Sequence, residues 1–240
     1  MSYTVKRYKK ENDESYTLGT TLTIELLKYK PEKTKIVLLH SQIDGEGGKR
    51  IVELCEKNGI PYETNDKAFN ILSQKENCFA IGVFEKFEER INPDTDHIVL
   101  VNPSNSGNLG TIIRSSLGFG MRDLAIITPA VDVFDPKTVR SSMGAVFSLR
   151  ISHYSTFNEY IQSVSKRNCY PFMLQAKFSL DKAEFVRPAS LVFGNESSGL
   201  PDNFLKVGDP VIIKHTDSID SLNLPTAVGI ALYKFTEGKF

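Results

Sequence analysis

The sequence predicts an α/β protein, and three observations support that fold class. Short apolar runs alternate with segments of helical spacing along most of the 240 residues. The chain is 40% hydrophobic and 24% charged, so it can bury a core and still present a polar surface. Polar turns follow several of the apolar runs, as they do at the strand ends of a parallel sheet. The length suits one large domain or two small ones.

The first alternation predicts a small α/β domain. Residues 35–40 form an apolar run that predicts a buried strand, and residues 47–58 have helical spacing and end at Gly59, a common helix-ending residue. The elements expected after this helix are a strand at 60–64, a helix at 67–73 and a strand at 79–84. Charged and turn-forming residues at 85–96 then predict a linker.

The second alternation predicts a mostly parallel sheet. Strands are expected at 97–101, 124–128, 147–153, 171–175, 191–193 and 211–213. Helices are expected at about 108–118, at 137–144, at 157–167 and in a last segment that reaches residue 234. Strands that alternate with helices form parallel sheets, whose ligands lie at the carboxyl ends of the strands.

Charge and hydropathy narrow the classes of function. Basic and acidic residues both number 29, so the net charge of zero argues against coating of nucleic acid by bulk attraction. An RNA partner would need local basic patches, for which the candidates are Lys6, Arg7, Lys9, Lys10, Arg114, Arg122, Lys137, Arg140 and Arg150. No stretch approaches the roughly 18 apolar residues of a membrane span, and residues 1–10 lack the apolar core of a signal peptide. We therefore expect a cytoplasmic protein without a membrane partner.

Neither a metal site nor a phosphate-binding loop is predicted. The three cysteines and four histidines are scattered, so we expect reduced structural cysteines and no metal. The glycine cluster at 45–48 is not a nucleotide loop, because Ile43 and Arg50 occupy the places of its first glycine and its Ser/Thr. Gly107 and Gly110 lack the glycine spacing of a dinucleotide fold.

Three polar turns share one pattern of strand, turn and helix. Their residues are Asn108, Gly110 and Arg114 in the first, Gly194, Glu196, Gly199 and Leu200 in the second, and Ser221, Leu222 and Asn223 in the third. Because each turn follows a predicted strand, the three turns could converge on one site.

In order and spacing, these turns resemble the three motifs of the SpoU/TrmH family of RNA ribose 2′-O-methyltransferases, in the SPOUT superfamily. The resemblance covers about residues 97–240. It implies a trefoil-knotted, parallel-sheet methyltransferase domain at 93–240 that binds S-adenosylmethionine and works as a homodimer. Residues 17–90 resemble the substrate-binding domain of such enzymes, so 1–92 is expected to be a smaller α/β domain of ribosomal-protein type with a short basic leader.

The resemblance also implies roles for single residues. Gly194, Ile213 and Leu222 would contact the cofactor through their backbone. Arg114 would carry the chemistry, and we interpret it first as a clamp on the substrate phosphate and a stabiliser of the developing alkoxide, because a guanidinium stays protonated. Its action as a general base stays open. Asn108, Ser221 and Asn223 would orient the arginine and the ribose, and Glu196 would fix the arginine or the knot loop.

Each of these residues also has a purely structural alternative. Asn108 and Ser221 could cap helices, Asn223 could satisfy a turn, Arg114 could pair with a surface acid, and Glu196 could cap the next helix. Two positions depart from the family's pattern, Lys214 and Pro225, and Pro225 is compatible with the first turn of the last helix.

The predicted function is therefore S-adenosylmethionine-dependent methylation of a ribose 2′-hydroxyl in RNA. The front domain favours ribosomal RNA over transfer RNA as the partner. The alternatives are a transfer RNA 2′-O-methyltransferase and a non-catalytic RNA-binding protein on the same fold.

Overall fold

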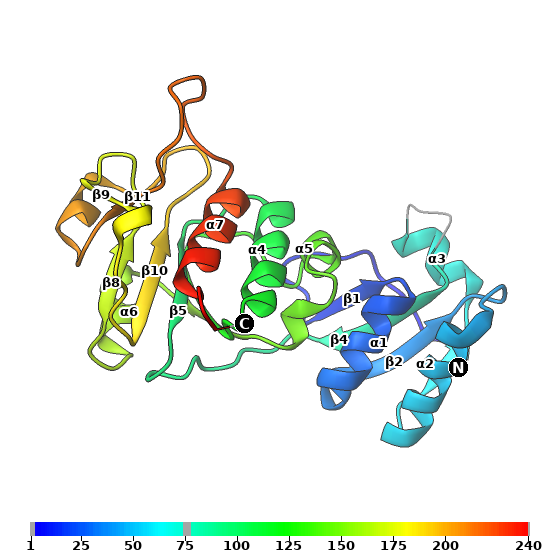
Figure 1. Cartoon of the computed structure of the whole chain (residues 1–240). Helices are drawn as coiled ribbons and strands as arrows, with labels where there is room; N and C mark the ends of the chain where they lie inside the picture. The colour runs from blue at the N-terminus through cyan, green and yellow to red at the C-terminus, as the bar shows by residue number, and fades with distance from the viewer. Residues whose placement is uncertain (1–2, 74–77, 240) are drawn as a thin grey trace. The chain divides into compact units, whose positions relative to one another are not determined.

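A computed structural model describes residues 3–73 and 78–239. Its contacts divide the chain into two compact units. The first unit is Met1–Phe87 with Asp132–Ser148, and the second is Glu88–Val131 with Leu149–Phe240 (Figure 1). The division predicted from the sequence, 1–92 and 93–240, has a single boundary and did not include the return of 132–148 to the first unit.

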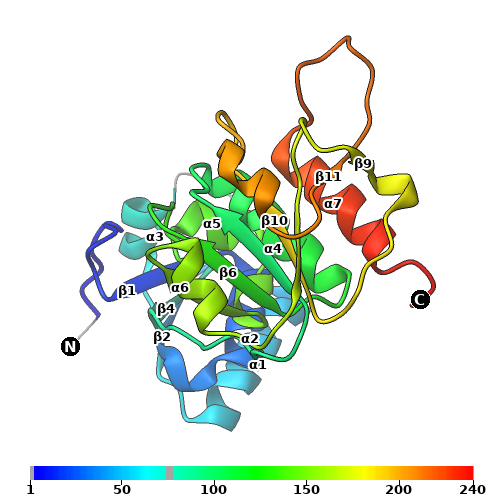
Figure 2. The ribbon, with the colours of Figure 1, turned by 90° about the vertical axis from the view of Figure 1, so that its left-hand side faces the viewer.

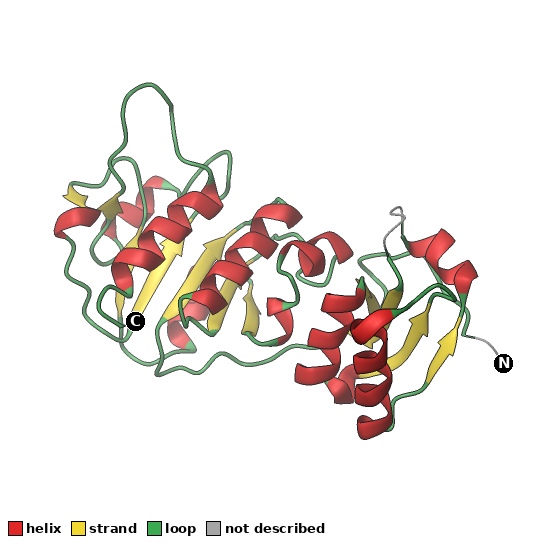
Figure 3. Ribbon diagram, turned by 45° about the vertical axis from the view of Figure 1, so that its right-hand side comes forward, coloured by secondary structure: helices red, strands yellow, loops and turns green. Residues whose placement is uncertain are grey.

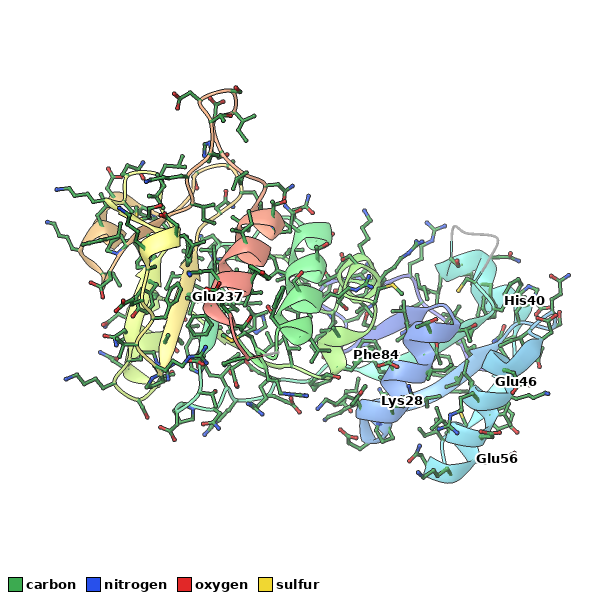
Figure 4. The ribbon with its side chains drawn as sticks, viewed as in Figure 1. Lys28, His40, Glu46, Glu56, Phe84 and Glu237 are labelled. Atoms are coloured by element: carbon green, nitrogen blue, oxygen red, sulfur yellow. The ribbon has the colours of Figure 1, made fainter. Side chains whose placement is uncertain are left out.

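The first unit is built on a four-stranded sheet in the order β1-β4-β2-β3. β4 runs antiparallel to β1 and β2, whereas β2 and β3 are parallel. The strands are β1 Glu14–Leu18, β2 Thr34–Leu39, β3 Tyr62–Thr64 and β4 Ala80–Glu85. The helices are α1 Thr20–Tyr29, α2 Gly45–Asn58, α3 Asp66–Leu72 and α5 Pro136–Ser141, with short 3-10 turns η1 Pro31–Lys33 and η2 Ala145–Phe147. Glu46 and Glu56 lie on the exposed side of α2 (Figure 4).

The returning segment 132–148 is held by aromatic and ionic contacts within the first unit. The ring of Phe84 on β4 packs edge-on against Phe134 at 5.7 Å and Phe147 at 5.2 Å between centroids. Asp132 forms an ion pair of 2.7 Å with Lys86, and both side chains are mostly buried. Burial alone would raise the pKa of Asp132, but the hydrogen bonds from Lys86 and Tyr8 hold it below its ordinary value. These contacts explain why the segment belongs to the first unit.

The second unit is built on a five-stranded sheet in the order β7-β6-β5-β10-β8, in which all neighbours are parallel. Its strands are β5 His97–Val101, β6 Asp123–Ile127, β7 Arg150–Tyr154, β8 Asn168–Pro171 and β10 Ala189–Phe193. Two short strands, β9 Phe178–Ser179 and β11 Val211–Ile212, pair in parallel beside it. The α/β class and the parallel sheet predicted from the sequence are confirmed.

Helices cover the second sheet and long loops extend from its strand ends. The helices are α4 Ser106–Gly118, α6 Phe157–Gln162 and α7 Leu224–Phe235, with 3-10 turns η3 Leu180–Lys182 and η4 Asp202–Lys206. α4 and α7 pack side by side (Figure 1). Tyr160 of α6 packs in a core with Val99, Ala125 and Val192 of the sheet, and α6 lies in front of β6 in Figure 2. The loop between β11 and α7 projects from the unit at the top of Figure 3.

A buried histidine lies at the start of β5, at the amino end of the sheet. His97 is fully buried, and its Nε2 lies 2.8 Å from the carbonyl oxygen of Asn92. Because a carbonyl only accepts, Nε2 carries the proton and Nδ1 accepts from Tyr160 and Arg167, each at 2.8 Å. Burial lowers the pKa of His97 from 6.5 to about 4. The structure therefore requires a neutral imidazole.

This histidine makes the stability of the protein fall in mild acid. The unfolded chain binds a proton at His97 below about pH 6.5, whereas the folded chain resists it down to about pH 4. The free energy of unfolding should therefore drop by about 2 kcal/mol between about pH 7 and pH 5. Urea denaturation across this range measures the drop. His97→Gln has no such proton to gain and should show a flatter dependence, whereas equal slopes in the two proteins would contradict this assignment.

Candidate functional site

A cavity of about 330 Å³ lies in the second unit, where β8, β10 and β11 end. Its volume is in the range of small-molecule sites. The wall is formed by residues 172–175, 193–200, 213, 215, 220–222, 224 and 227. The cavity thus draws on segments far apart in the sequence, which the parallel order of the sheet brings to one edge.

The cavity brings together five of the eight residues named from the sequence. Gly194, Ile213 and Leu222, expected to contact a cofactor, all line it, and so do Glu196 and Ser221. Asn108, Arg114 and Asn223 are outside the lining set. The roles of all eight residues in binding or catalysis remain predictions, but the second and third turns do converge.

Gly194 is required by the close approach of two backbone segments. A Cβ atom at this position would lie 2.1 Å from the carbonyl carbon and 2.3 Å from the carbonyl oxygen of Gly199, well inside contact distance. The turn between them is closed by Asn195 and Gly199, whose backbone groups exchange hydrogen bonds of 3.2 and 2.9 Å. Gly199 has a φ of +66°, a conformation that glycine adopts without strain. At Gly194 and Gly199 the wall of the cavity is therefore formed by main-chain atoms without side chains.

Asn195 is a site residue to which the sequence analysis gave no role. Its amide nitrogen donates to the carbonyl oxygen of Asn102 at 2.8 Å, which joins this turn to the loop after β5. Its amide oxygen accepts from the backbone N–H of Ser197 at 2.9 Å and from the hydroxyl of Ser197 at 2.8 Å. An asparagine followed by two serines is a local signal for such a turn.

Glu196 ties the same two loops together with both carboxylate oxygens. Oε2 accepts from the backbone N–H of Ser104 at 3.0 Å and from its hydroxyl at 2.8 Å. Oε1 accepts from the N–H of Asn105 at 3.1 Å and from Nδ2 of Asn108 at 3.3 Å. Partial burial would raise the pKa of Glu196, but these hydrogen bonds lower it below its ordinary value. Glu196 therefore stays ionised and holds the loop that precedes α4.

Replacing Glu196 with glutamine should destabilise the second unit. The amide would turn an N–H group toward donors that now share two acceptor oxygens, so at least one donor loses its partner. We expect Glu196→Gln to lower the free energy of unfolding by about 1–3 kcal/mol. The matched change Glu184→Gln affects an exposed carboxylate and should leave stability nearly unchanged. Thermal or urea unfolding of both variants makes the comparison, and equal losses would contradict the role given to Glu196.

The first polar turn contributes to the site through α4. This helix is capped by Asn105 and not by Asn108, the residue considered in the sequence analysis. The side chain of Asn105 caps α4 by accepting from the N–H of Asn108 at 3.0 Å. Asn108 lies in the first turn of the helix and directs its amide to Glu196. The alternative that Asn108 caps the helix is therefore wrong.

Arg114 lies apart from the cavity. It is exposed on α4, and no hydrogen-bond or ion-pair partner is found for its side chain within 3–73 and 78–239. It follows Asn108 by six residues, which is a rise of about 9 Å and a rotation of about 240° along a helix. The alternative that it pairs with a surface acid is not seen among these residues.

The third turn presents two free polar side chains. Ser221 and Asn223 are exposed, and neither side chain has a hydrogen-bond partner in the described part of the chain. Asn223 occupies the N-cap position of α7 without a side-chain cap bond, so Ser221 does not cap this helix. Pro225 lies in the first turn of α7, as expected. Both polar groups are thus available to a ligand.

Neither a membrane-spanning helix nor a metal site is present among the described residues. Their helices are too short or too polar to span a bilayer. No group of three or more His, Cys, Asp or Glu side chains among them could hold a metal ion.

Comparison with known proteins links this arrangement to one family. Residues 96–233 match the model of the SpoU rRNA Methylase family. The 23S rRNA (uridine(2479)-2′-O)-methyltransferase of Streptomyces viridochromogenes is 32% identical over 145 residues, which are 57% of this chain and 50% of that protein. The chain thus spans about half the length of this relative. The 23S rRNA (guanosine(2553)-2′-O)-methyltransferase RlmP of Bacillus subtilis is 24% identical over 232 residues, which are 94% of this chain and 90% of that protein.

Solved structures agree with this fold. The SpoU methyltransferase AviRb from Streptomyces viridochromogenes, in complex with AdoMet, has a TM-score of 0.82 at 22% identity and covers 95% of this chain and 91% of its own. An AdoMet-bound rRNA methyltransferase from Sinorhizobium meliloti has a TM-score of 0.80 at 24% identity. The match covers 92% of this chain and 86% of that chain. The match to the family model spans more than half of the chain. The chain belongs to the SpoU rRNA methylase family.

Proposed function

We propose that this chain is an S-adenosylmethionine-dependent methyltransferase that modifies a ribose 2′-hydroxyl of RNA, with ribosomal RNA favoured. The observation that carries the proposal is the single cavity into which the second and third motif turns converge, with Gly194, Ser221 and Leu222 in its wall. Family membership supports it, because several relatives bear names of 2′-O-methyltransferases of 23S rRNA.

The residues of the cavity fit S-adenosylmethionine. The volume of about 330 Å³ suits a molecule of this size. At Gly194 the backbone itself forms the wall, and a Cβ would fill the space, so N–H and C=O groups can approach a ligand closely. Phe172, Leu222 and Ala227 supply apolar surface for a purine ring. When bound, S-adenosylmethionine supplies a methyl group on a positively charged sulfur, which is open to attack by a hydroxyl.

The remaining residues would orient the RNA and hold the developing charge. Ser221 and Asn223 carry hydrogen-bonding groups that no described residue engages and that can position a ribose. Glu196 keeps the loop before α4 in place and stays ionised, so it does not exchange protons near neutral pH. Arg114 stays charged and suits a phosphate clamp and a stabiliser of the alkoxide.

A homodimer forms part of the proposal, because one chain alone leaves Arg114 outside the cavity. A second copy that presents its own Arg114 would complete each site. The side chain of Arg114 is exposed and has no partner among residues 3–73 and 78–239, which is compatible with such a contact.

A second candidate function is methylation of transfer RNA. A putative tRNA (cytidine(34)-2′-O)-methyltransferase of Listeria innocua is 27% identical over 145 residues, which are 58% of this chain and 85% of that protein. Its match covers little more than half of this chain. We favour ribosomal RNA because the match to the 23S rRNA enzyme of Bacillus subtilis extends over 94% of the chain and therefore includes the first unit.

Transfer of a labelled methyl group tests the function. The purified chain is incubated with labelled S-adenosylmethionine and either ribosomal or transfer RNA, both isolated from cells that lack the corresponding gene so that the target is unmodified. Label in a 2′-O-methylnucleoside of ribosomal RNA supports the proposal, and label in transfer RNA alone supports the second candidate. RNA binding without cofactor binding or transfer would identify a non-catalytic RNA-binding protein.

A further inference from the structure

The polar side chains of the cavity fall into two groups. Those of Asn195, Glu196, Ser197 and Ser198 already form hydrogen bonds within the loops. Those of Gln175, His215, Asp220 and Ser221 also line the cavity but take no part in these bonds. Within the second group, Gln175, Asp220 and Ser221 are exposed, whereas His215 is half-buried. His215 is therefore the polar side chain of this group that the protein itself shields most.

The structure also fixes the hydrogen-bonding character of His215. Its Nδ1 lies 3.0 Å from the carbonyl oxygen of Thr216. A carbonyl oxygen only accepts, so Nδ1 must be the donor and carry the proton. In the neutral ring the other nitrogen, Nε2, is then unprotonated and can only accept a hydrogen bond. His215 lines the cavity, and in this tautomer Nε2 is the ring atom that can accept a hydrogen bond from a ligand.

The apolar residues that line the same cavity favour a flat, neutral ligand group as the donor. Phe172 and Phe193 stack at 4.5 Å between centroids and an angle of 11°, and both line the same cavity. Leu222, Leu224 and Ala227 add further apolar surface. A ligand ammonium group would be better matched by a carboxylate such as that of Asp220. The 6-amino group of an adenine ring is an uncharged donor at the edge of an apolar plane.

We propose that Nε2 of His215 accepts a hydrogen bond from the 6-amino group of the adenine of S-adenosylmethionine and so determines base specificity in the cavity. This inference rests on the proposed function, because it concerns the same cofactor. It assigns a role to a histidine to which the sequence analysis gave none. His215 is a binding residue here and takes no part in methyl transfer.

The test compares two ligands that differ at this group. S-adenosylhomocysteine carries the 6-amino group, whereas S-inosylhomocysteine carries a carbonyl oxygen there, which would face the acceptor of His215. Calorimetry of the full chain gives the ratio of the two dissociation constants. We expect the wild type to prefer the adenine ligand, and His215→Leu to reduce that preference about five- to tenfold. His215→Gln, whose amide oxygen can accept, should keep most of the preference.

Controls separate this inference from the proposed function. His153→Leu changes a histidine outside the cavity and should leave the preference unchanged. Should His215→Leu fail to fold, His215→Asn removes the acceptor at the Nε2 position and should lose the preference in the same way. An unchanged preference in a folded His215 variant overturns the inference, even where methyl transfer slows, because His215 would then act on the RNA. A wild type that binds neither ligand overturns the proposed function itself.

Discussion

Gly194→Ala should abolish binding of S-adenosylmethionine. The added methyl group would meet the backbone of Gly199 and Leu200 at 2.1 to 2.3 Å, and backbone atoms at that distance have no flexible end that could move aside. The turn that forms one wall of the cavity must therefore open. We expect the dissociation constant to rise by at least about a hundredfold, and methyl transfer to be lost with it.

Calorimetry with S-adenosylmethionine measures this effect, and thermal unfolding shows how far the change spreads. Gly118→Ala is the matched control, because a Cβ there would meet nothing within 4 Å and the residue lies outside the cavity. It should bind the cofactor as the wild type does. Normal affinity in Gly194→Ala would mean that the cofactor lies elsewhere.

Arg114→Ala should remove most of the methyl transfer and leave cofactor binding intact. The guanidinium is charged, exposed and unpaired in the described part of the chain, and it lies outside the cavity. Loss of a charged group that stabilises a developing alkoxide slows turnover by about two to three orders of magnitude. The affinity for S-adenosylmethionine should change by less than about twofold.

Single-turnover transfer and calorimetry separate the two effects of Arg114→Ala. Arg122→Ala is the control, since Arg122 is also exposed in the second unit. Its rate of transfer at saturating RNA should remain close to that of the wild type. Unchanged transfer in Arg114→Ala would remove Arg114 from the catalytic proposal.

The same variants can test the homodimer. Chains carrying Arg114→Ala and chains carrying Gly194→Ala are each expected to be inactive alone. If each site takes Arg114 from the second copy, a mixed dimer has one intact site, and random exchange of subunits restores about a quarter of the wild-type activity. No recovery in mixed dimers would place Arg114 with the cavity of its own chain.

The second sheet could be predicted from the sequence because its strands are buried on both faces. Residues 97–101 and 124–128 were expected as strands, and β5 and β6 lie at His97–Val101 and Asp123–Ile127. Parallel strands covered on both sides are apolar runs, which are strong signals. The convergence of the second and third turns followed from the same pattern.

The first unit was harder to predict because its core includes polar residues. β1 and α1 were not expected, and Ser15, Thr17 and Thr23 in them are fully buried. The hydroxyl oxygens of Thr17 and Thr23 lie 2.8 Å apart. The hydroxyl of Thr17 also accepts a hydrogen bond from the N–H of Gly82 at 2.8 Å. Gly82 is 65 residues from Thr17, and the burial of these polar side chains obscures the alternation of apolar and polar residues. The return of 132–148 likewise depends on Phe84 meeting Phe134 and Phe147.

Within the site, local spacing located the turns but did not reveal how they are held. The partner of the Asn195 amide is a carbonyl group 93 residues away, and Glu196 reaches Ser104 over 92 residues. Neither pairing has a signature in the sequence near either partner. For Arg114 the situation is reversed. Its sequence motif is clear, but within one chain Arg114 does not line the cavity. The trefoil knot remains a prediction of the resemblance.

The carboxylate of Glu196 has a consequence for the kind of ligand that this sheet can accept. It binds the N–H groups of Ser104 and Asn105 at the amino end of α4, where α/β proteins often bind the phosphates of nucleotides. In this chain the carboxylate of Glu196 itself occupies that position. A phosphate-bearing cofactor would have to displace an ionised side chain, whereas S-adenosylmethionine carries no phosphate at all. A phosphate group at this place would compete with the carboxylate of Glu196, so under the proposed function the phosphates of the substrate would be held by cationic side chains such as Arg114.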